Sequence, residues 1–177
     1  MERPFRSLSV LVLTVSALAS TAGASAETAR ALLRPTGEAT VSGEVYFEDT
    51  DGGLRVRAEV RGAAPGKHGF HIHEFGACGD SGKAAGGHYN PAGHPHGNAL
   101  TGGAGAAHAG DLGNIEVGEE GIGRIEALLP EVKLAGGVYT VAGRSVVFHE
   151  KEDDFGQPLG NAGGRSACGT ITILAAS

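Results

Sequence analysis

The sequence contains eight histidines, and several of them stand at spacings that suit metal binding. His71 and His73 flank Ile72, and residues two positions apart on a β-strand project from the same face. Phe70 and Ile72 would then point to the opposite face and pack in the core. A metal site requires imidazoles held side by side on rigid backbone, whereas a lone histidine is more often a structural residue. We therefore predict a metal site on this strand.

A second group of candidate ligands follows along the chain: His88, His96, His108 and Asp111. Three imidazoles and one carboxylate form a closed tetrahedral set for Zn²⁺, which binds such ligands at about 2.0–2.2 Å. His149 ends a predicted strand and offers one more imidazole. Nitrogen-rich tetragonal ligation favours Cu(II). The seven side chains of both groups serve two four-coordinate ions only if one histidine binds both.

Strands and loops are expected to position these side chains. Glycine accounts for 31 of the 177 residues, and tryptophan is absent, which favours a loop-rich all-β protein because glycine is unfavourable in helices. Apolar and polar residues alternate over 39–47 and 54–60, with hairpin-turn residues between the two runs. Further runs with strand character are 67–74, 113–117, 121–129, 137–149 and 167–174. No segment has a convincing helical pattern.

Two stretches lack this periodicity, 76–111 and 150–165. Loops of this length inside a compact domain are usually functional or disordered. Most histidines lie on or beside the first stretch, which favours function. The chain length fits one domain, and we find no internal repeat.

The first 26 residues match the three-part pattern of a cleaved secretory signal. Basic residues precede an apolar run at 8–19, and small residues end at Ala26 before Glu27. The run is shorter than the roughly 20 residues that span a bilayer, so a membrane anchor is the weaker interpretation. We predict a mature domain at 27–177 that is exported to the periplasm or the extracellular space.

The formal net charge of −6 argues against a nucleic-acid binder or a binder of anionic membranes, because both need a broad cationic surface. An anionic substrate needs a local positive feature instead. The two cysteines, Cys78 and Cys168, both lie in the exported part. An even number in an oxidising compartment predicts one disulfide, with two free buried thiols as the alternative.

Six segments stand in an order that a known family shares: GFHIHE at 69–74, GGHYNP at 86–91, HG at 96–97, HAGDLGN at 108–114, VFHEKEDD at 147–154 and GNAGGRSACG at 160–169. They resemble the copper,zinc superoxide dismutase family, and the short interval from His73 to Cys78 resembles its bacterial exported members. The resemblance covers essentially the whole mature chain. It implies an all-β fold, a Greek-key β-barrel or sandwich of immunoglobulin-like type with two long functional loops.

The resemblance implies one copper and one zinc per subunit. The implied copper ligands are His71, His73, His88 and His149. The implied zinc ligands are His88, His96, His108 and Asp111. His88 is shared as an imidazolate bridge, and it forms the implied catalytic pair with Arg165, which resembles the arginine beside copper.

Other residues resemble the family's supporting positions. Asp153 resembles a carboxylate that hydrogen-bonds His71 and His96 and so orients both rings. His68 resembles a framework histidine that is hydrogen-bonded beneath the metal site. His94 matches no ligand, and we interpret it as a solvated surface side chain.

The disulfide and one loop also bear on the resemblance. Cys78 and Cys168 resemble the disulfide that ties the metal loop to the last strand. The segment at 154–160 is shorter than the eukaryotic electrostatic loop, so we do not expect the family's lysine-guided substrate funnel. Lys83 and Lys151 are interpreted as solvated surface charges, with a role in substrate approach as the alternative, which leaves the active-site arginine as the main local cation.

The implied activity is the dismutation of superoxide to O₂ and H₂O₂, which serves antioxidant defence. Copper alternates between Cu(II) and Cu(I), and zinc has a structural and electronic role. On reduction His88 leaves copper, takes a proton while it stays on zinc, and later returns that proton. Superoxide is the implied small-molecule partner, and a homodimer is a further form that the family implies.

Two other functions fit a cluster of metal ligands. A periplasmic protein that buffers or delivers metal is one, but delivery sites for Cu(I) favour sulfur-rich ligands, and the chain has one methionine. A zinc hydrolase is another, but it needs an open zinc position and a general base, and the predicted zinc set is closed. We therefore favour the dismutase.

Overall fold

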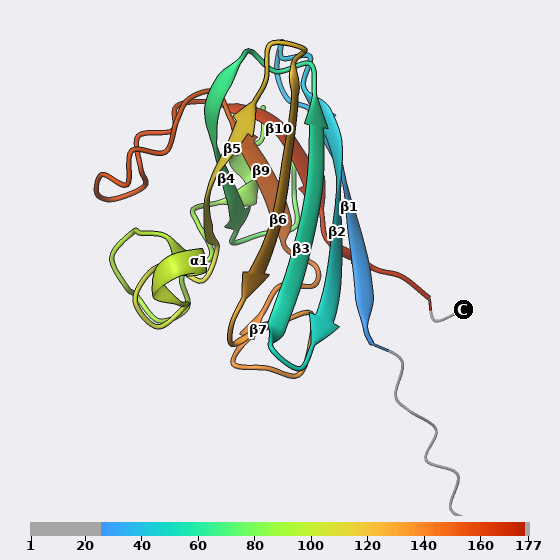
Figure 1. Cartoon of the computed structure of the whole chain (residues 1–177), viewed down its shortest axis with the longest axis vertical. Coiled ribbons are helices and arrows are strands. Elements are labelled where there is room, and N and C mark those ends of the chain that lie inside the picture. Colours follow the sequence, from blue (N-terminus) through green and yellow to red (C-terminus); the bar gives the residue numbers. More distant parts are fainter. Residues whose placement is uncertain (1–25, 176–177) are drawn as a thin grey trace, which may run out of the picture.

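Strands dominate the computed structural model of the chain, which describes residues 26–175 (Figure 1). The long strands are β1 (Thr28–Pro35), β2 (Ser42–Thr50), β3 (Gly53–Arg61), β4 (Gly66–His73), β5 (Asp111–Val117), β6 (Ile122–Leu129), β9 (Ser145–His149) and β10 (Arg165–Thr170). The short elements are a 3₁₀ turn (Lys83–Ala85), α1 (Ala99–Gly102), β7 (Val132–Lys133), β8 (Tyr139–Thr140) and β11 (Thr172–Ile173).

The long strands close into an antiparallel barrel. Their order is β10-β9-β4-β5-β6-β3-β2-β1, and β1 pairs with β10 to complete the ring. β3 pairs with β6 rather than with β4, so the strands from β3 to β6 form a Greek key. The predicted all-β Greek-key barrel is therefore confirmed.

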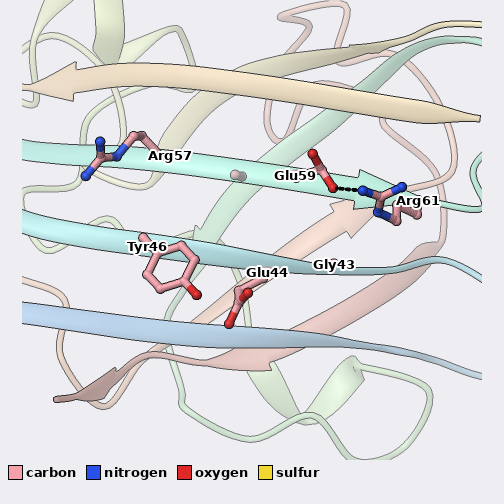
Figure 2. A pocket seen from close by; sticks show the side chains of 7 residues that line it. Gly43, Glu44, Tyr46, Arg57, Glu59 and Arg61 are labelled. Carbon is pink, nitrogen blue, oxygen red and sulfur yellow. Dashed lines mark ion pairs between the residues drawn. The ribbon is translucent and has the colours of Figure 1, made fainter.

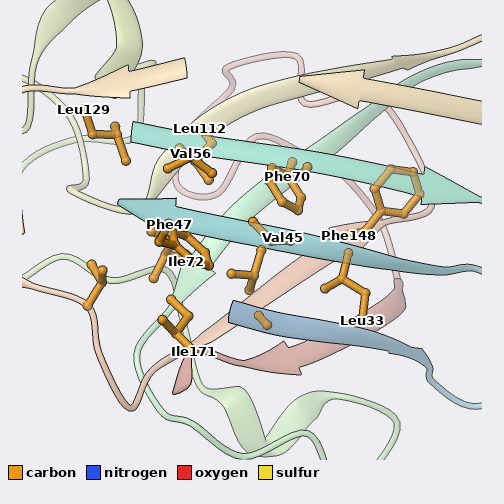
Figure 3. Close-up of a cluster of buried hydrophobic side chains, with 14 of the residues drawn as sticks. Leu33, Val45, Phe47, Val56, Phe70, Ile72, Leu112, Leu129, Phe148 and Ile171 are labelled. Carbon is orange, nitrogen blue, oxygen red and sulfur yellow. The ribbon is translucent and has the colours of Figure 1, made fainter. Parts of the chain in front are cut away.

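Alternating side chains of the strands fill the barrel. Val45 and Phe47 of β2 are buried, while their neighbours in the sequence face outward. Phe70 and Ile72 of β4 belong to the same core, as predicted. Figure 3 shows these side chains together with Phe148 of β9. Because Phe70 and Ile72 pack in the core, His71 and His73 lie on the opposite face of β4.

Most of the predicted strands are confirmed. They are the runs at 39–47, 54–60, 67–74, 113–117 and 121–129, which overlap β2, β3, β4, β5 and β6 in turn. The hairpin turn also lies where predicted, since Thr50 pairs with Gly53. Long helices are absent from residues 26–175, where α1 has four residues.

Three details of the strand prediction are wrong. The run at 137–149 is not one strand, because the chain turns at Gly143 (φ 77°) between β8 and β9. The run at 167–174 likewise divides into β10 and β11. The prediction also missed β1, in which Ala29 and Ala31 occupy buried positions. Small alanines give a weak alternation of hydrophobicity, so the strand signal is faint.

Both predicted long loops are present, and they occupy 74–110 and 150–164. The first follows β4 and the second follows β9, two strands that pair directly. Figure 1 shows both loops on the same side of the barrel, beside β4 and β5. This placement lets residues of both loops meet the histidines of the two strands.

A groove on the outer face of β2 and β3 is separate from the candidate ligands (Figure 2). Glu44 and Tyr46 border it from β2, and Arg57, Glu59 and Arg61 border it from β3. Glu59 forms an ion pair with Arg61. Exposed ion pairs of this kind contribute little to stability, and the groove contains no histidine.

The ends of the chain bear on the predicted export. The predicted signal at 1–26 lies outside the described residues, except for Ala26. The predicted domain from 27 onward contains every strand of the barrel. No helix within residues 26–175 has the length and apolar character of a membrane span.

Candidate metal centre

Three of the predicted ligands come from two neighbouring strands. β4 and β9 pair in antiparallel fashion, with His71 opposite Val147 and His73 opposite Ser145. His149 ends β9. All three histidines are buried, with at most 5% of each residue exposed. The barrel backbone therefore fixes half of the candidate histidines directly.

The other ligands come from the first long loop and the start of β5. His88 forms an isolated β-bridge with His73, which holds it against β4. His96 and His108 lie farther along the loop, and Asp111 begins β5. All of these side chains are buried as well.

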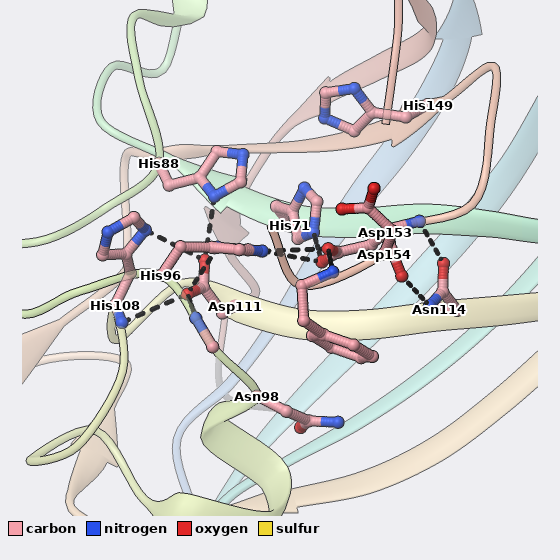
Figure 4. Close-up of polar contacts among 12 residues, drawn as sticks. His71, His88, His96, Asn98, His108, Asp111, Asn114, His149, Asp153 and Asp154 are labelled. Carbon is pink, nitrogen blue, oxygen red and sulfur yellow. Dashed lines mark hydrogen bonds and ion pairs between the residues drawn. The ribbon is translucent and has the colours of Figure 1, made fainter. Parts of the chain in front are cut away.

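The candidate ligands form two clusters that share one histidine. Within each cluster, one nitrogen or oxygen atom from every residue lies within 4.8 Å of the others. The first cluster is His71, His73, His88 and His149. The second cluster is His88, His96, His108 and Asp111 (Figure 4). His88 is thus placed between two groups of donors.

Hydrogen bonds fix which ring nitrogen carries the lone pair in the first cluster. His73 Nδ1 donates to the carbonyl of Gly86 at 3.1 Å. His149 Nδ1 donates to the carbonyl of Gly163 at 3.4 Å. The two Nε2 atoms therefore carry lone pairs in the neutral rings, and they face each other at 3.3 Å. Facing lone pairs repel each other, and a cation between them removes the repulsion, so this geometry fits a metal ion.

His71 offers a further lone pair to the first cluster. Its Nε2 donates to Asp153 Oδ2 at 2.8 Å, so Nδ1 carries the lone pair in the neutral ring. Nδ1 is buried and has no hydrogen-bond partner in the described part of the chain. Buried polar atoms are rarely left unpaired, and a ligand histidine commonly has its other nitrogen bonded to a carboxylate. His71 therefore fits a metal ligand.

The second cluster is arranged around the Asp111 carboxylate. Oδ1 lies 2.8 Å from His88 Nδ1 and 3.1 Å from His108 Nδ1. Oδ2 lies 2.9 Å from His96 Nδ1. Burial alone raises the pKa of Asp111, but the hydrogen bonds from the three rings hold it well below its usual range. Three nitrogens and one ionised oxygen match the composition of a closed zinc site.

Burial sets the protonation of three rings in the centre. Burial and neighbouring rings lower the pKa of His73 to about 2, of His88 to about 4 and of His149 to about 3. These rings are neutral at pH 7, so their lone pairs are available. Burial also lowers the pKa of His96, but hydrogen bonds to two carboxylates outweigh burial and raise it to about 9. Metal binding at His96 therefore displaces a proton.

Asp153 links the two clusters from the side opposite the candidate metals. Its carboxylate accepts hydrogen bonds from His71 Nε2 at 2.8 Å and from His96 Nε2 at 2.9 Å. These bonds offset burial and hold the pKa of Asp153 well below its usual range. One ionised carboxylate therefore orients one ring of each cluster.

A cavity of about 310 Å³ opens in front of the first cluster. His73 and His149 line it from the interior, and Arg165 lines it from β10. The Arg165 guanidinium donates hydrogen bonds to the carbonyls of Gly82 and Gly86 in the first loop. The arrangement places a positive charge beside the first cluster, where a small anion can enter.

The remaining predicted residues have simpler roles. Cys78 and Cys168 form a disulfide, so the predicted pairing is confirmed. His68 lies beneath the centre, with its Nδ1 3.0 Å from the carbonyl of His149. His94 is half-buried and belongs to neither cluster.

Sequence reasoning missed three residues that hold the loops around the centre. Asn114 pairs through its carboxamide with the backbone of Asp153. Gly160, with φ of 75°, packs its backbone against the side chains of Asp153 and His96. Gln157 pairs through its carboxamide with the backbone of His96. Asn114 and Gly160 lie within the family-like segments, which was a usable signal, whereas Gln157 lies between two of them.

Known proteins are similar to this chain in sequence and in fold. A family model described as copper/zinc superoxide dismutase matches residues 41–171. An extracellular Cu-Zn superoxide dismutase of Onchocerca volvulus is 40% identical over 167 residues, which cover 88% of this chain and 80% of that protein. A Cu-Zn superoxide dismutase of the same organism is 40% identical over 150 residues, covering 78% and 92%. A solved structure, the crystal structure analysis of the clock protein EA4, is 37% identical with a TM-score of 0.74, covering 85% of this chain and 96% of that chain.

Proposed function

Because the chain belongs to the copper/zinc superoxide dismutase family, we propose that the two clusters form one copper site and one zinc site in each chain. The enzyme dismutes superoxide to O₂ and H₂O₂. We assign copper to His71, His73, His88 and His149. We assign zinc to His88, His96, His108 and Asp111. The observation that carries the assignment is the 3.3 Å approach of the lone-pair nitrogens of His73 and His149.

The donor sets differ in the metal that they suit. Four imidazoles suit Cu(II), whereas three imidazoles and one carboxylate suit Zn²⁺. Bound copper supplies one-electron transfer, so that one superoxide is oxidised to O₂ and a second, with two protons, is reduced to H₂O₂. The residues of the chain then have to bind the anion, hold the rings in place and supply protons.

We assign proton transfer to His88. Its Nδ1 faces Asp111 at 2.8 Å, which leaves Nε2 for the first cluster. Burial lowers the pKa of His88 to about 4, so the ring is neutral near pH 7. Nε2 would be the copper-binding atom of His88, and it would also be the atom that carries a proton to the reduced substrate.

We assign substrate attraction to Arg165. Superoxide is an anion, and the chain has a formal net charge of −6. A cation at the cavity opposes the repulsion that this net charge causes. The guanidinium is held by two backbone carbonyls of the first loop, so its charge has a fixed position beside His73 and His149.

We place the domain from residue 27 onward outside the cytoplasm, in the periplasm or the extracellular space. The disulfide between Cys78 and Cys168 fits an oxidising compartment. One relative is named as an extracellular enzyme, which agrees with this location.

Reconstitution of the purified, metal-free protein tests this proposal. The protein is loaded with zinc alone, with copper alone or with both, and the rate of superoxide loss is measured for each form. We expect activity only in the forms that contain copper, with the rate proportional to bound copper. Protein with full occupancy of both metals and no activity would contradict the dismutase assignment and favour metal storage or delivery. Ester or amide hydrolysis by the zinc-only form would favour a hydrolase.

A further inference from the structure

Three carboxamide side chains, one in each long loop and one in β5, make the same contact, in which one side chain bonds to both the backbone N–H and the backbone C=O of another residue. We call this contact a carboxamide clamp. The clamps are Asn90 on His94 (3.0 and 2.9 Å), Asn114 on Asp153 (2.7 and 2.9 Å) and Gln157 on His96 (3.0 and 2.9 Å). Of the three, the clamp of Gln157 holds a candidate zinc ligand.

The Gln157 clamp joins the two long loops. Gln157 lies in the second loop, 61 residues from His96 in the first. The backbone at His96 is irregular, so no strand pairing holds it. Within residues 26–175, Gln157 is the only hydrogen-bond partner of the two backbone groups of His96. The exposed side chain of Gln157 therefore fixes the backbone of His96, as strand pairing fixes the backbone of His71 and His73 in β4.

His96 needs a fixed backbone because both nitrogens of its ring are used. Nε2 donates to Asp153 at 2.9 Å, while Nδ1 lies 2.9 Å from Asp111 Oδ2. A shift or rotation of the peptide unit moves the ring away from at least one of these carboxylates. The two hydrogen bonds of Gln157 hold that peptide unit in one orientation.

From these contacts we propose that Gln157 is a positioning residue of the zinc site. It holds the backbone of His96 so that Nδ1 faces the zinc position while Nε2 stays on Asp153. The inference rests on the proposed function, because it takes His96 as a zinc ligand. Gln157 does not line the cavity in front of the copper cluster, so its effect on the metals passes through His96.

Two substitutions of Gln157 and one matched control test this role. Gln157→Met keeps the length of the side chain and removes both hydrogen bonds, and it opens no cavity because Gln157 is exposed. Gln157→Glu keeps an acceptor for the N–H of His96 but loses the donor to its carbonyl. Asn90→Ala removes an equivalent clamp from His94, which belongs to neither cluster.

The first measurement is the rate of zinc release. Each protein is loaded with copper and zinc and mixed with an excess of a coloured zinc chelator. Loss of a contact that supports a metal ligand weakens binding about 10–100-fold. We expect Gln157→Met to release zinc at least about tenfold faster than the unaltered protein, Gln157→Glu to show an intermediate rate, and Asn90→Ala to stay close to the unaltered protein.

The second measurement separates positioning from a general loss of structure. Co²⁺ is bound in place of zinc, and the visible absorption spectrum reports the geometry of its ligands. We expect the spectrum to change in Gln157→Met and to stay unchanged in Asn90→Ala. Urea unfolding of the metal-free proteins should give similar stabilities for these two variants.

The outcomes separate this inference from the proposed function. If the unaltered protein binds zinc and Gln157→Met shows unchanged zinc release and an unchanged Co²⁺ spectrum, only the role of Gln157 is overturned. If Gln157→Met and Asn90→Ala accelerate release equally, the specific role of Gln157 is also overturned. If the unaltered protein binds no zinc, the proposed function fails and this inference fails with it.

Discussion

At the scale of single residues, the centre depends on which nitrogen each imidazole uses for a hydrogen bond. His73 and His149 use Nδ1, which donates to backbone carbonyls. His71 and His96 use Nε2, which donates to Asp153. The remaining nitrogens converge within the two clusters. Arg165 bonds backbone carbonyls of the first loop and no ring nitrogen, so its substitution should affect activity without removing the metals.

Arg165→Ala is expected to lower kcat/KM for superoxide while the copper content stays unchanged. Electrostatic attraction of this kind raises association rates by about 10–10³-fold, so we expect a loss of about tenfold or more. The rate should also depend less on ionic strength. Rapid-mixing assays at several salt concentrations, with copper measured in the same samples, check this. Arg165→Lys should keep part of the rate, and an unchanged rate in Arg165→Ala would remove this residue from the mechanism.

The lowered pKa values of the buried histidines predict how the stability of the metal-free protein depends on pH. His73, His88 and His149 have pKa values of about 2, 4 and 3 in the folded chain, against an ordinary value of 6.5. Above pH 6.5 these rings are neutral in the folded and the unfolded chain. Below it, the unfolded chain takes up protons that the folded chain excludes. The free energy of unfolding therefore falls as the pH drops below 6.5.

His96 adds the opposite dependence at higher pH. Its pKa is raised to about 9, so the stability that its proton contributes is complete below pH 6.5 and is lost as the pH rises through 9. We expect the free energy of unfolding of the metal-free protein to be greatest near pH 6–7. It should fall by on the order of a few kcal/mol toward pH 4. Urea unfolding at a series of pH values checks this. A stability that increases steadily down to pH 4 would contradict it.

At the scale of elements, the second loop closes over the hydrogen bond between Asp153 and His96. Gly160 packs there with φ of 75°, and a Cβ at this position would overlap the Asp153 carboxylate and lie 2.6 Å from His96 Nε2. We expect Gly160→Ala to destabilise the metal-free protein by more than the roughly 1–2 kcal/mol that left-handed backbone costs a residue with a Cβ. It should also weaken zinc binding.

A second glycine supplies the control for this substitution. Gly136 has φ of 70°, and a Cβ there meets no atom within 4 Å. Gly136→Ala therefore introduces the same backbone strain without the overlap. Urea unfolding and zinc titration of both variants check the prediction. Equal effects in the two variants would show that Gly160 does not support the contact between Asp153 and His96.

Much of the arrangement of elements could be predicted from the sequence, because large apolar residues alternate in β2 and β3. β1 could not, since its buried positions include small alanines. The side chains that converge could also be predicted, because His71 and His73 share a strand face and the others lie in family-like segments. Gln157 could not, because its partners are backbone groups, and contacts to backbone leave no pattern of residue types.

At the scale of the whole molecule, the disulfide ties the first loop to the closed barrel. Cys78 lies in that loop and Cys168 in β10, and 90 residues separate them. A crosslink over this separation stabilises the fold mainly by restricting the unfolded chain, by about 4–5 kcal/mol in the chain-entropy treatment. The same loop carries the carbonyls that hold Arg165.

Replacement of both cysteines by serine is therefore expected to lower the free energy of unfolding by several kcal/mol, with about 4–5 kcal/mol as the upper estimate. Urea unfolding of the metal-free protein and of the Cys78→Ser, Cys168→Ser variant at the same pH checks this. Reduction of the unaltered protein should reproduce the effect without any substitution. Equal midpoints for the oxidised and reduced protein would contradict the prediction.

The central claim is that seven side chains hold two different metals because His88 serves both. Elemental analysis of the purified protein, loaded with copper and zinc and then dialysed, tests it most directly. Our account predicts one copper and one zinc bound to each chain. Saturation at one metal ion per chain would contradict it, because His88 would then have no second metal to bridge.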